Sequence, residues 1–238
     1  MSRMTDFGRM QQIQREYMKT CDCPALVPAL GRDKVLRMIC ALGEMVDIIK
    51  KEGWETVMED EPTRKQFLFE IVDVMMYATV LIMCYGVTPE EMTAVYEGKH
   101  AYNYTRWDDT PEEDYILESR AARKGRLMDL FRCQQIAREL RARYQWQPLV
   151  PEHGAETLLW LMGEVGEIIE IIIEKGDAAI ENDAEVRREF LKEVTDVWMY
   201  LSEITIEFGF TPEALSDACE EKAAFNPTRG LAGREADA

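Results

Sequence analysis

Apolar residues recur along most of the chain at the three-to-four-residue spacing of an amphipathic α-helix, and no stretch alternates convincingly between apolar and polar positions. This pattern predicts an all-α protein with two sets of four helices. A fourth helix is expected to begin at Thr88, because Pro89 suits the first helical turn and Glu91 completes a capping box. Its counterpart begins at Thr211. The other helices are expected over about residues 7–18, 33–51 and 63–85, and again over about 128–144, 155–175 and 184–208.

The two sets of helices have similar sequences. The segment FGRMQQIQRE near the N-terminus is matched by LFRCQQIARE at an offset of 123 residues. In the second helix we align LGEMVDIIKK with MGEVGEIIEI, which shifts the offset to 120 residues before it returns to 123. Ordered similarity of this kind indicates an internal duplication.

We therefore interpret the chain as two copies of one four-helix unit, at residues 1–107 and 122–230. A charged linker at 108–121 joins the copies, and a tail at 231–238 follows the second one. Two copies are few for an extended solenoid, so we expect them to pack as a compact helical bundle.

Each copy carries two pairs of carboxylates on consecutive helices, and the two members of each pair are spaced i, i+3. This spacing places both side chains on one helical face, where like charges repel. A single pair of this kind is typical of solvated surface, but two pairs that recur in order in both copies favour binding of a hard divalent cation such as Mg²⁺ or Mn²⁺. The predicted metal ligands are Glu44, Asp47, Glu70 and Asp73 in the first copy and Glu164, Glu167, Glu193 and Asp196 in the second.

A second group of polar residues follows the carboxylates in each copy. Lysine and arginine donate charge-assisted hydrogen bonds to phosphate, and asparagine adds a neutral donor. A basic helix end that complements the helix dipole would explain the lysines but not the repeated asparagine. We therefore predict phosphate or nucleotide contacts at Lys99, Asn103 and Arg106, and at Lys222, Asn226 and Arg229.

The overall charge narrows the range of ligands. A net charge of −17 argues against binding to a nucleic-acid polymer, whose phosphates attract a basic surface. The six cysteines lack zinc-finger spacing, which favours reduced thiols and a cytoplasmic location. The apolar run at residues 74–85 is shorter than a membrane span, so we expect a buried core helix and no membrane partner.

With these residues together, the chain resembles the all-α nucleoside triphosphate pyrophosphatases, which include MazG-like proteins and dimeric dUTPases. That family has an E-x-x-E pair, then an E-x-x-D pair, and then Lys, Asn and Arg. The second copy matches the whole pattern. The first copy departs from it at Asp47, which is one methylene shorter than Glu, and carries Lys51 on the same helical face. The resemblance implies two tandem MazG-like repeats packed as an intramolecular pseudo-dimer, and a homodimer of the chain would match the family's tetramers.

The resemblance also implies a Mg²⁺-dependent enzyme. It would be a nucleoside triphosphate pyrophosphohydrolase that releases a nucleoside monophosphate and pyrophosphate, and would clear the nucleotide pool. Glu164 or Glu167 would act as the base, and the sequence does not choose between them. Lys222 and Arg229 would stabilise the leaving pyrophosphate. Selection of the nucleobase would fall to residues of the first helix, such as Gln12 or Gln135.

Three alternatives remain open at this point. The first is a dUTPase-like enzyme with narrow base specificity. The second is a non-catalytic nucleotide-binding protein or sensor on the same fold, which the departures at Asp47 and Lys51 would suit. The third is a plain helical scaffold that binds no ligand.

Overall fold

The computed structural model describes residues 4–20, 24–106 and 126–236, with side chains as far as Phe225. Within these ranges it contains nine α-helices and no strand, so the expected all-α class is confirmed. The expected linker at 108–121 lies outside the described residues, and the side chains of Asn226 and Arg229 do as well.

The helices fall before and after the break at residue 106, and we call residues 4–106 the first half and residues 126–236 the second half. The first half contains α1 (Phe7–Thr20), α2 (Pro28–Glu59), α3 (Glu61–Cys84) and α4 (Pro89–Thr105). The second half contains α6 (Leu130–Tyr144), α7 (Gly154–Glu174), α8 (Asp177–Asn182), α9 (Ala184–Glu207) and α10 (Pro212–Ala236), with a short 3-10 turn at Pro151–His153.

The ends of the long helices follow from local chemistry. The side chain of Asp60 accepts a hydrogen bond from the backbone N–H of Thr63 at 2.9 Å, and so caps the start of α3. Thr88 caps α4 in the same way, through the N–H of Glu91 at 3.1 Å, as expected from the sequence. Gly86 follows α3 with a φ of 67°, a left-handed conformation that glycine adopts without a steric penalty.

In each half a glycine interrupts the helix just after the point where the sequence predicts the second helix to end, near residues 51 and 175, and a short helical stretch that was not predicted follows. Gly53 has φ 82° and ψ 157° inside α2, and Gly176 has φ 80° and ψ 160° between α7 and α8. Both conformations lie in a region that glycine alone occupies readily. The chain therefore turns at each glycine before a short helical stretch leads to the next long helix, and α2 continues to Glu59 rather than ending near residue 51.

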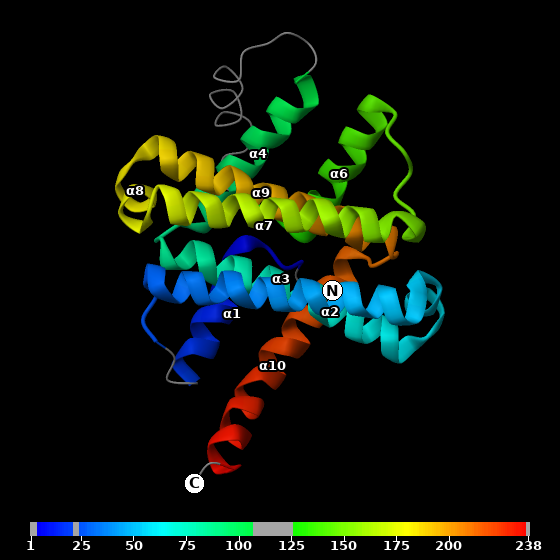
Figure 1. Ribbon diagram of the computed structural model, residues 1–238, viewed down its shortest axis with the longest axis horizontal. Helices are drawn as coiled ribbons and strands as arrows, with labels where there is room; N and C mark the ends of the chain where they lie inside the picture. The colour runs from blue at the N-terminus through cyan, green and yellow to red at the C-terminus, as the bar shows by residue number, and fades with distance from the viewer. Residues whose placement is uncertain (1–3, 21–23, 107–125, 237–238) are drawn as a thin grey trace.

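The helices form two packed layers flanked by a pair of helices at each end. Figure 1 shows α2 beside α3 in one layer and α7 beside α9 in the other, with α1 and α10 extending to one side and α4 and α6 to the opposite side. The layers meet where α3 contacts α9. The arrangement places α4 of the first half on α9, and α10 of the second half on α3.

Aromatic side chains fill the boundary between the halves. The rings of Phe67 and Phe208 lie 4.6 Å apart, and those of Tyr85 and Phe190 lie 5.0 Å apart. All four residues are buried. Each pair joins α3 or its end to α9 or its end, so the main hydrophobic core belongs to both halves together.

Several contacts between the halves occur twice, with the halves exchanged. The backbone N–H of Thr5 donates to the Ser216 hydroxyl at 3.1 Å, and the N–H of Met128 donates to the Thr93 hydroxyl at 3.0 Å. Each partner lies 123 residues from its counterpart. Reciprocity of this kind is the property of an interface with two-fold symmetry.

The helix α3 is long and apolar enough, by length and composition alone, to cross a membrane. Its most apolar window is 72% buried inside the protein. The burial arises from packing against α2, α1, α10 and α9, which is the environment of a core helix.

The shared core predicts that neither half folds independently. Residues 1–107 or 122–238, expressed alone, should show no cooperative urea transition as a monomer, because each would expose the aromatic surface that the other covers. Mixing the two fragments should restore a cooperative transition. Circular dichroism during urea titration, with size-exclusion chromatography to fix the oligomeric state, makes the measurement. A monomeric fragment with a sharp transition would contradict the prediction.

Candidate functional site

A cleft of about 740 Å³ lies in the second half, between α7 and α9, and is closed on one side by α4 of the first half. Seven carboxylates and three basic side chains line it, together with several aromatic rings. We call it the second-half cleft. Four of the carboxylates, Glu164, Glu167, Glu193 and Asp196, lie on neighbouring turns of α7 and α9.

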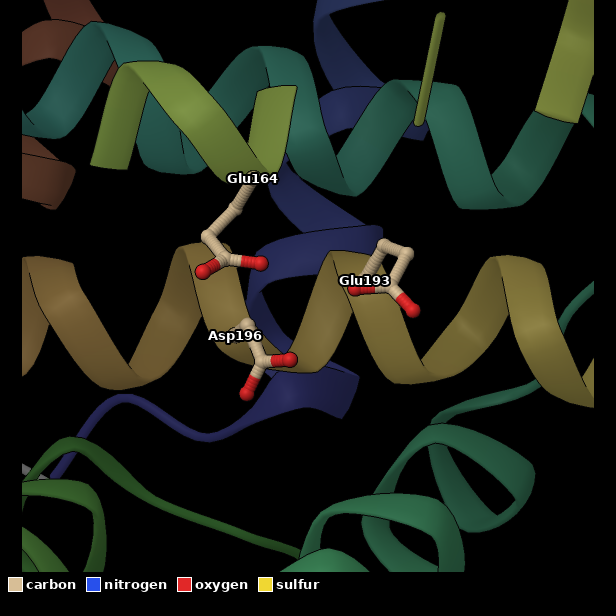
Figure 2. A group of neighbouring side chains, drawn as sticks. All are labelled: Glu164, Glu193 and Asp196. Carbon is tan, nitrogen blue, oxygen red and sulfur yellow. The ribbon is translucent and has the colours of Figure 1, made fainter. Parts of the chain in front are cut away.

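An acidic trio is formed by Glu164 on α7 and by Glu193 and Asp196 on α9. Figure 2 shows Glu164 extending from α7 toward α9, which carries Glu193 and Asp196. One oxygen atom of each carboxylate lies within 4.8 Å of the others. Adjacent ligand oxygens of an octahedral Mg²⁺ lie about 3 Å apart, so the three side chains would have to move closer together to bind one ion directly.

The pKa values of the acidic trio are raised. Burial is the main cause for Glu164, followed by the charges of Asp196 and the neighbouring glutamates, and its pKa reaches about 7. Burial also raises the pKa of Glu193 to about 7, although the charge of Lys99 opposes the shift. The pKa of Asp196 is raised for the same reason. The trio is therefore costly to ionise fully without a cation, and a divalent cation fits its chemistry.

The first half supplies a cation to this site. The ammonium group of Lys99 on α4 contacts the carboxylate of Asp196, and both side chains are less than one-fifth exposed, at 15% and 18%. Asn103 and Arg106 follow on the same helix and also line the cleft. The hydroxyl of Tyr144 donates to the backbone carbonyl of Asn103 at 2.7 Å and so anchors the end of α4.

This arrangement differs from the one expected from the sequence, which placed Lys222 and its neighbours with the carboxylates of their own copy. Lys222 contacts Asp73 of the first half and donates to the carbonyl of Phe69 at 2.9 Å. The basic residues are exchanged because α4 and α10 pack across the boundary between the halves. The sequence of one copy does not indicate whether its last helix packs on the third helix of its own copy or on that of the other copy.

Two tryptophans also line the cleft. Trp160 on α7 is 59% exposed and Trp146 is 46% exposed. The ring of Trp146 stacks on Tyr144 with 5.3 Å between centroids. Exposed rings at the mouth of a cleft can stack on a planar ligand such as a nucleobase.

A buried carboxylate that was not among the predicted site residues lines the cleft as well. Glu207 is 3% exposed, and one of its oxygens accepts a hydrogen bond from the Thr157 hydroxyl at 2.7 Å. Its other oxygen has no hydrogen-bond partner among the described residues. Burial raises the pKa of Glu207 to about 7. It lies eleven residues after Asp196 on α9, or about 16 Å along the helix.

A sequence signal for Glu207 does exist. The residue is a single carboxylate within the apolar stretch ITIEFGF, just as Asp73 lies within an apolar run on α3. A charge in such a place requires a partner or a ligand. It was overlooked because its counterpart in the first half is Cys84, so the duplication does not repeat it.

The structure also changes the alignment of the second helix. Gly53 and Gly176 adopt the same unusual conformation and lie 123 residues apart, and the buried positions of α2 and α7 match at that offset. Glu164 is therefore the counterpart of Ala41, and Glu44 corresponds to Glu167. The two carboxylates of a pair are three residues apart, so an alignment that is shifted by three residues still places one carboxylate on another. The sequence motif alone therefore favoured an offset of 120 over one of 123.

The predicted metal ligands on α2 do not join the others. The side chain of Glu44 is exposed, and Asp47 pairs with Lys51 at 2.7 Å. Neither residue lines the large pocket of the first half. The pairing with Lys51 is consistent with the position of that lysine on the same helical face.

The remaining predicted ligands are placed unequally. Glu167 lines the second-half cleft but lies outside the close trio. In the first half, Glu70 and Asp73 line a pocket in which Lys222 neutralises Asp73. Within the described part of the chain, the acidic trio is the group of carboxylates close enough to share one ion.

The glutamines proposed for base selection lie elsewhere. Gln12 and Gln135 are exposed, and neither lines the second-half cleft or the pocket of the first half. The adjacent Gln11 and Gln134 are buried and donate to backbone carbonyls at 3.0 and 2.8 Å, respectively. These buried glutamines therefore have a structural role.

Comparisons with protein family models, curated proteins and solved structures found no match to this chain. Its function is therefore inferred from the cleft. The acidic trio, whose donor set fits a divalent cation, lies in one cleft with Lys99, Asn103 and Arg106 and with exposed aromatic rings. An arrangement of this kind can accommodate a phosphorylated aromatic ligand.

The raised pKa values predict that stability falls as pH rises in the presence of a chelator. Between the ordinary glutamate pKa of 4.5 and the raised pKa of about 7, Glu164 and Glu193 hold protons in the folded protein that they lose when it unfolds. The melting temperature should therefore fall from pH 5 to pH 8. The Glu164→Gln/Glu193→Gln variant should show a clearly smaller fall, by about 2–4 °C for each kcal/mol of repulsion removed.

Differential scanning calorimetry in EDTA measures this effect. The matched control is Glu170→Gln/Glu174→Gln, which alters two exposed carboxylates of the same helix and should keep the pH dependence of the wild type. If the melting temperature of the Glu164→Gln/Glu193→Gln variant falls with pH as steeply as that of the control, these two carboxylates do not cause the pH dependence.

Proposed function

We propose that the chain is a Mg²⁺-dependent nucleoside triphosphate pyrophosphohydrolase whose active site is the second-half cleft. The observation that carries the proposal is the acidic trio beside Lys99, in a cleft that exposed aromatic rings also line. The proposed substrate lies along the cleft, with its triphosphate at the acidic trio and its base near Trp160. The volume of the cleft lies in the range of small-molecule sites.

The charge balance of the cleft supports a metal requirement. Carboxylates outnumber basic side chains by seven to three, so a bare triphosphate would be repelled. In the proposal, Glu164, Glu193 and Asp196 hold Mg²⁺. When bound, Mg²⁺ would polarise the phosphate oxygens and lower the pKa of a coordinated water.

The protein groups around the trio have complementary roles in the proposal. Glu167 lies next to the trio without belonging to it, so it is our candidate for the base that takes a proton from the attacking water. Lys99 neutralises Asp196 in the structure, and on substrate binding its ammonium would donate to a phosphate oxygen instead. Arg106 would add a second charged donor to the leaving pyrophosphate.

We also propose that the two halves are MazG-like repeats that form an intramolecular pseudo-dimer. The reciprocal hydrogen bonds of Thr5 and Met128 support this interpretation. The exchanged contacts Lys99–Asp196 and Lys222–Asp73 support it further. In such a pseudo-dimer each cleft requires both halves, because the carboxylates and the basic helix come from different copies.

The proposal predicts pyrophosphate release that depends on Mg²⁺ and on the trio. With a panel of ribo- and deoxyribonucleoside triphosphates, the Glu193→Gln/Asp196→Asn variant should lose at least about 100-fold in kcat/KM, because the charge that holds the ion is removed. The matched control is Glu70→Gln/Asp73→Asn, at the corresponding positions of α3, which should stay within about 3-fold of the wild type.

Two results would contradict the proposed function. One is the absence of pyrophosphate release from every nucleotide of the panel with Mg²⁺ or Mn²⁺ present. The other is an equal loss of activity in the α3 control, which would remove the distinction between the two halves.

The position of Glu207 predicts a role in base selection. Its unpaired oxygen could accept an N–H of a nucleobase, so Glu207→Gln should raise KM for the preferred nucleotide by about 10-fold and leave kcat nearly unchanged. Steady-state kinetics across the nucleotide panel measures the change in preference. An unchanged order of kcat/KM values among the bases would exclude Glu207 from recognition.

A further inference from the structure

A pocket of about 1290 Å³ lies in the first half, between α2, α3 and α10. We call it the first-half pocket. It occupies the position that corresponds to the second-half cleft, but four basic side chains and three carboxylates line it. Its charge balance is therefore reversed relative to the cleft, where carboxylates predominate.

The first-half pocket has fewer carboxylates than the second-half cleft at the positions where they could share one ion. Ala41 takes the place of Glu164, and Glu44 is exposed and does not line the pocket. Glu70 and Asp73 remain, but Asp73 is in contact with the ammonium of Lys222. The donor set does not resemble the acidic trio of the second half.

Basic residues on α2 replace uncharged ones. Lys34 and Arg37 stand where the second half has Thr157 and Trp160. Both cations pair with the same carboxylate oxygen of Asp33, at 3.1 and 2.9 Å. One carboxylate carries a single negative charge, so Lys34, Arg37 and Asp33 together retain one positive charge.

The other two basic residues of the lining are already paired, Lys65 with Glu221 at 2.6 Å and Lys222 with Asp73. Glu70 also lines the pocket. An anionic ligand would therefore bind at Lys34 and Arg37.

Aromatic rings lie beside the cations. The ammonium groups of Lys65 and Lys222 lie 5.1 and 5.2 Å from the centroid of the Phe69 ring. Phe225 on α10 is 57% exposed and lines the same pocket. Rings and cations together suit a ligand that has both a planar group and an anionic group.

We propose that the first-half pocket binds a nucleoside monophosphate without a metal ion. A phosphate monoester carries a charge of about −1.5 to −2 at pH 7, which Lys34 and Arg37 can bind directly. The choice of a nucleotide rests on the proposed function, since a nucleoside monophosphate is a product of that reaction. The pocket would then respond to product while the second-half cleft performs the hydrolysis.

Isothermal titration calorimetry of the full chain in EDTA tests the proposal, with dAMP, dCMP, dGMP and dUMP as separate probes. At least one should bind with a dissociation constant below about 1 mM. The Lys34→Gln/Arg37→Gln variant should bind at least 10-fold more weakly. The side chain of Arg37 is 55% exposed but that of Lys34 is only 18% exposed, so a melting curve verifies that the variant is folded.

Two controls locate the binding. Lys50→Gln/Lys51→Gln removes the same charge from a part of α2 outside the pocket and should leave binding unchanged. Glu193→Gln/Asp196→Asn alters the second-half cleft and should also leave it unchanged. Raising NaCl from 50 to 500 mM should weaken binding to the wild type, because the contacts are between opposite charges.

The proposal is overturned if none of the four probes binds in EDTA, or if binding depends on the second-half variant and not on Lys34 and Arg37. Failure of the proposed function is a separate result. If the protein binds a monophosphate in EDTA but releases no pyrophosphate with Mg²⁺, the result supports ligand binding in the first-half pocket and contradicts the proposed enzymatic activity.

Discussion

Three carboxylates that face one another in a partly buried cleft are the constraint on which the rest of the structure depends. Glu164, Glu193 and Asp196 can be neutralised by protons, by a lysine or by a divalent cation. Burial already raises the pKa of both glutamates to about 7. Lys99 neutralises Asp196 from the other half of the chain, so the electrostatics of the site and the packing of α4 on α9 stabilise each other.

The two halves have the same helical order but different charges at corresponding positions. Ala41 in place of Glu164, and a basic pair in place of Thr157 and Trp160, convert an acidic cleft into a pocket with a surplus of cations. The hydrophobic core contains residues of both halves, and the first half supplies Lys99 to the second-half cleft. If the chain arose by duplication, as its sequence indicates, the two sites have diverged on a common scaffold.

Much of the helical pattern could be predicted from the sequence, because apolar periodicity and the cap at Thr88 are local signals. The turns at Gly53 and Gly176 agree with the predicted ends of the second helices, but the short helical stretches after these glycines were not predicted, because such short segments do not show a helical period. The acidic trio was among the predicted ligands. The sequence alignment of α2 with α7 was wrong by three residues, because the two carboxylates of each pair are also three residues apart. The exchange of Lys99 and Lys222 between the halves depends on long-range packing, which a pattern within one copy does not encode.

The most direct test of the metal site is the anomalous diffraction signal of Mn²⁺ in crystals of the full chain. The proposed function predicts a strong peak among Glu164, Glu193 and Asp196, and no peak between Glu70 and Asp73. A second half without a peak at saturating Mn²⁺, or peaks of equal strength in both halves, would contradict the central claim that the second half alone holds the ion.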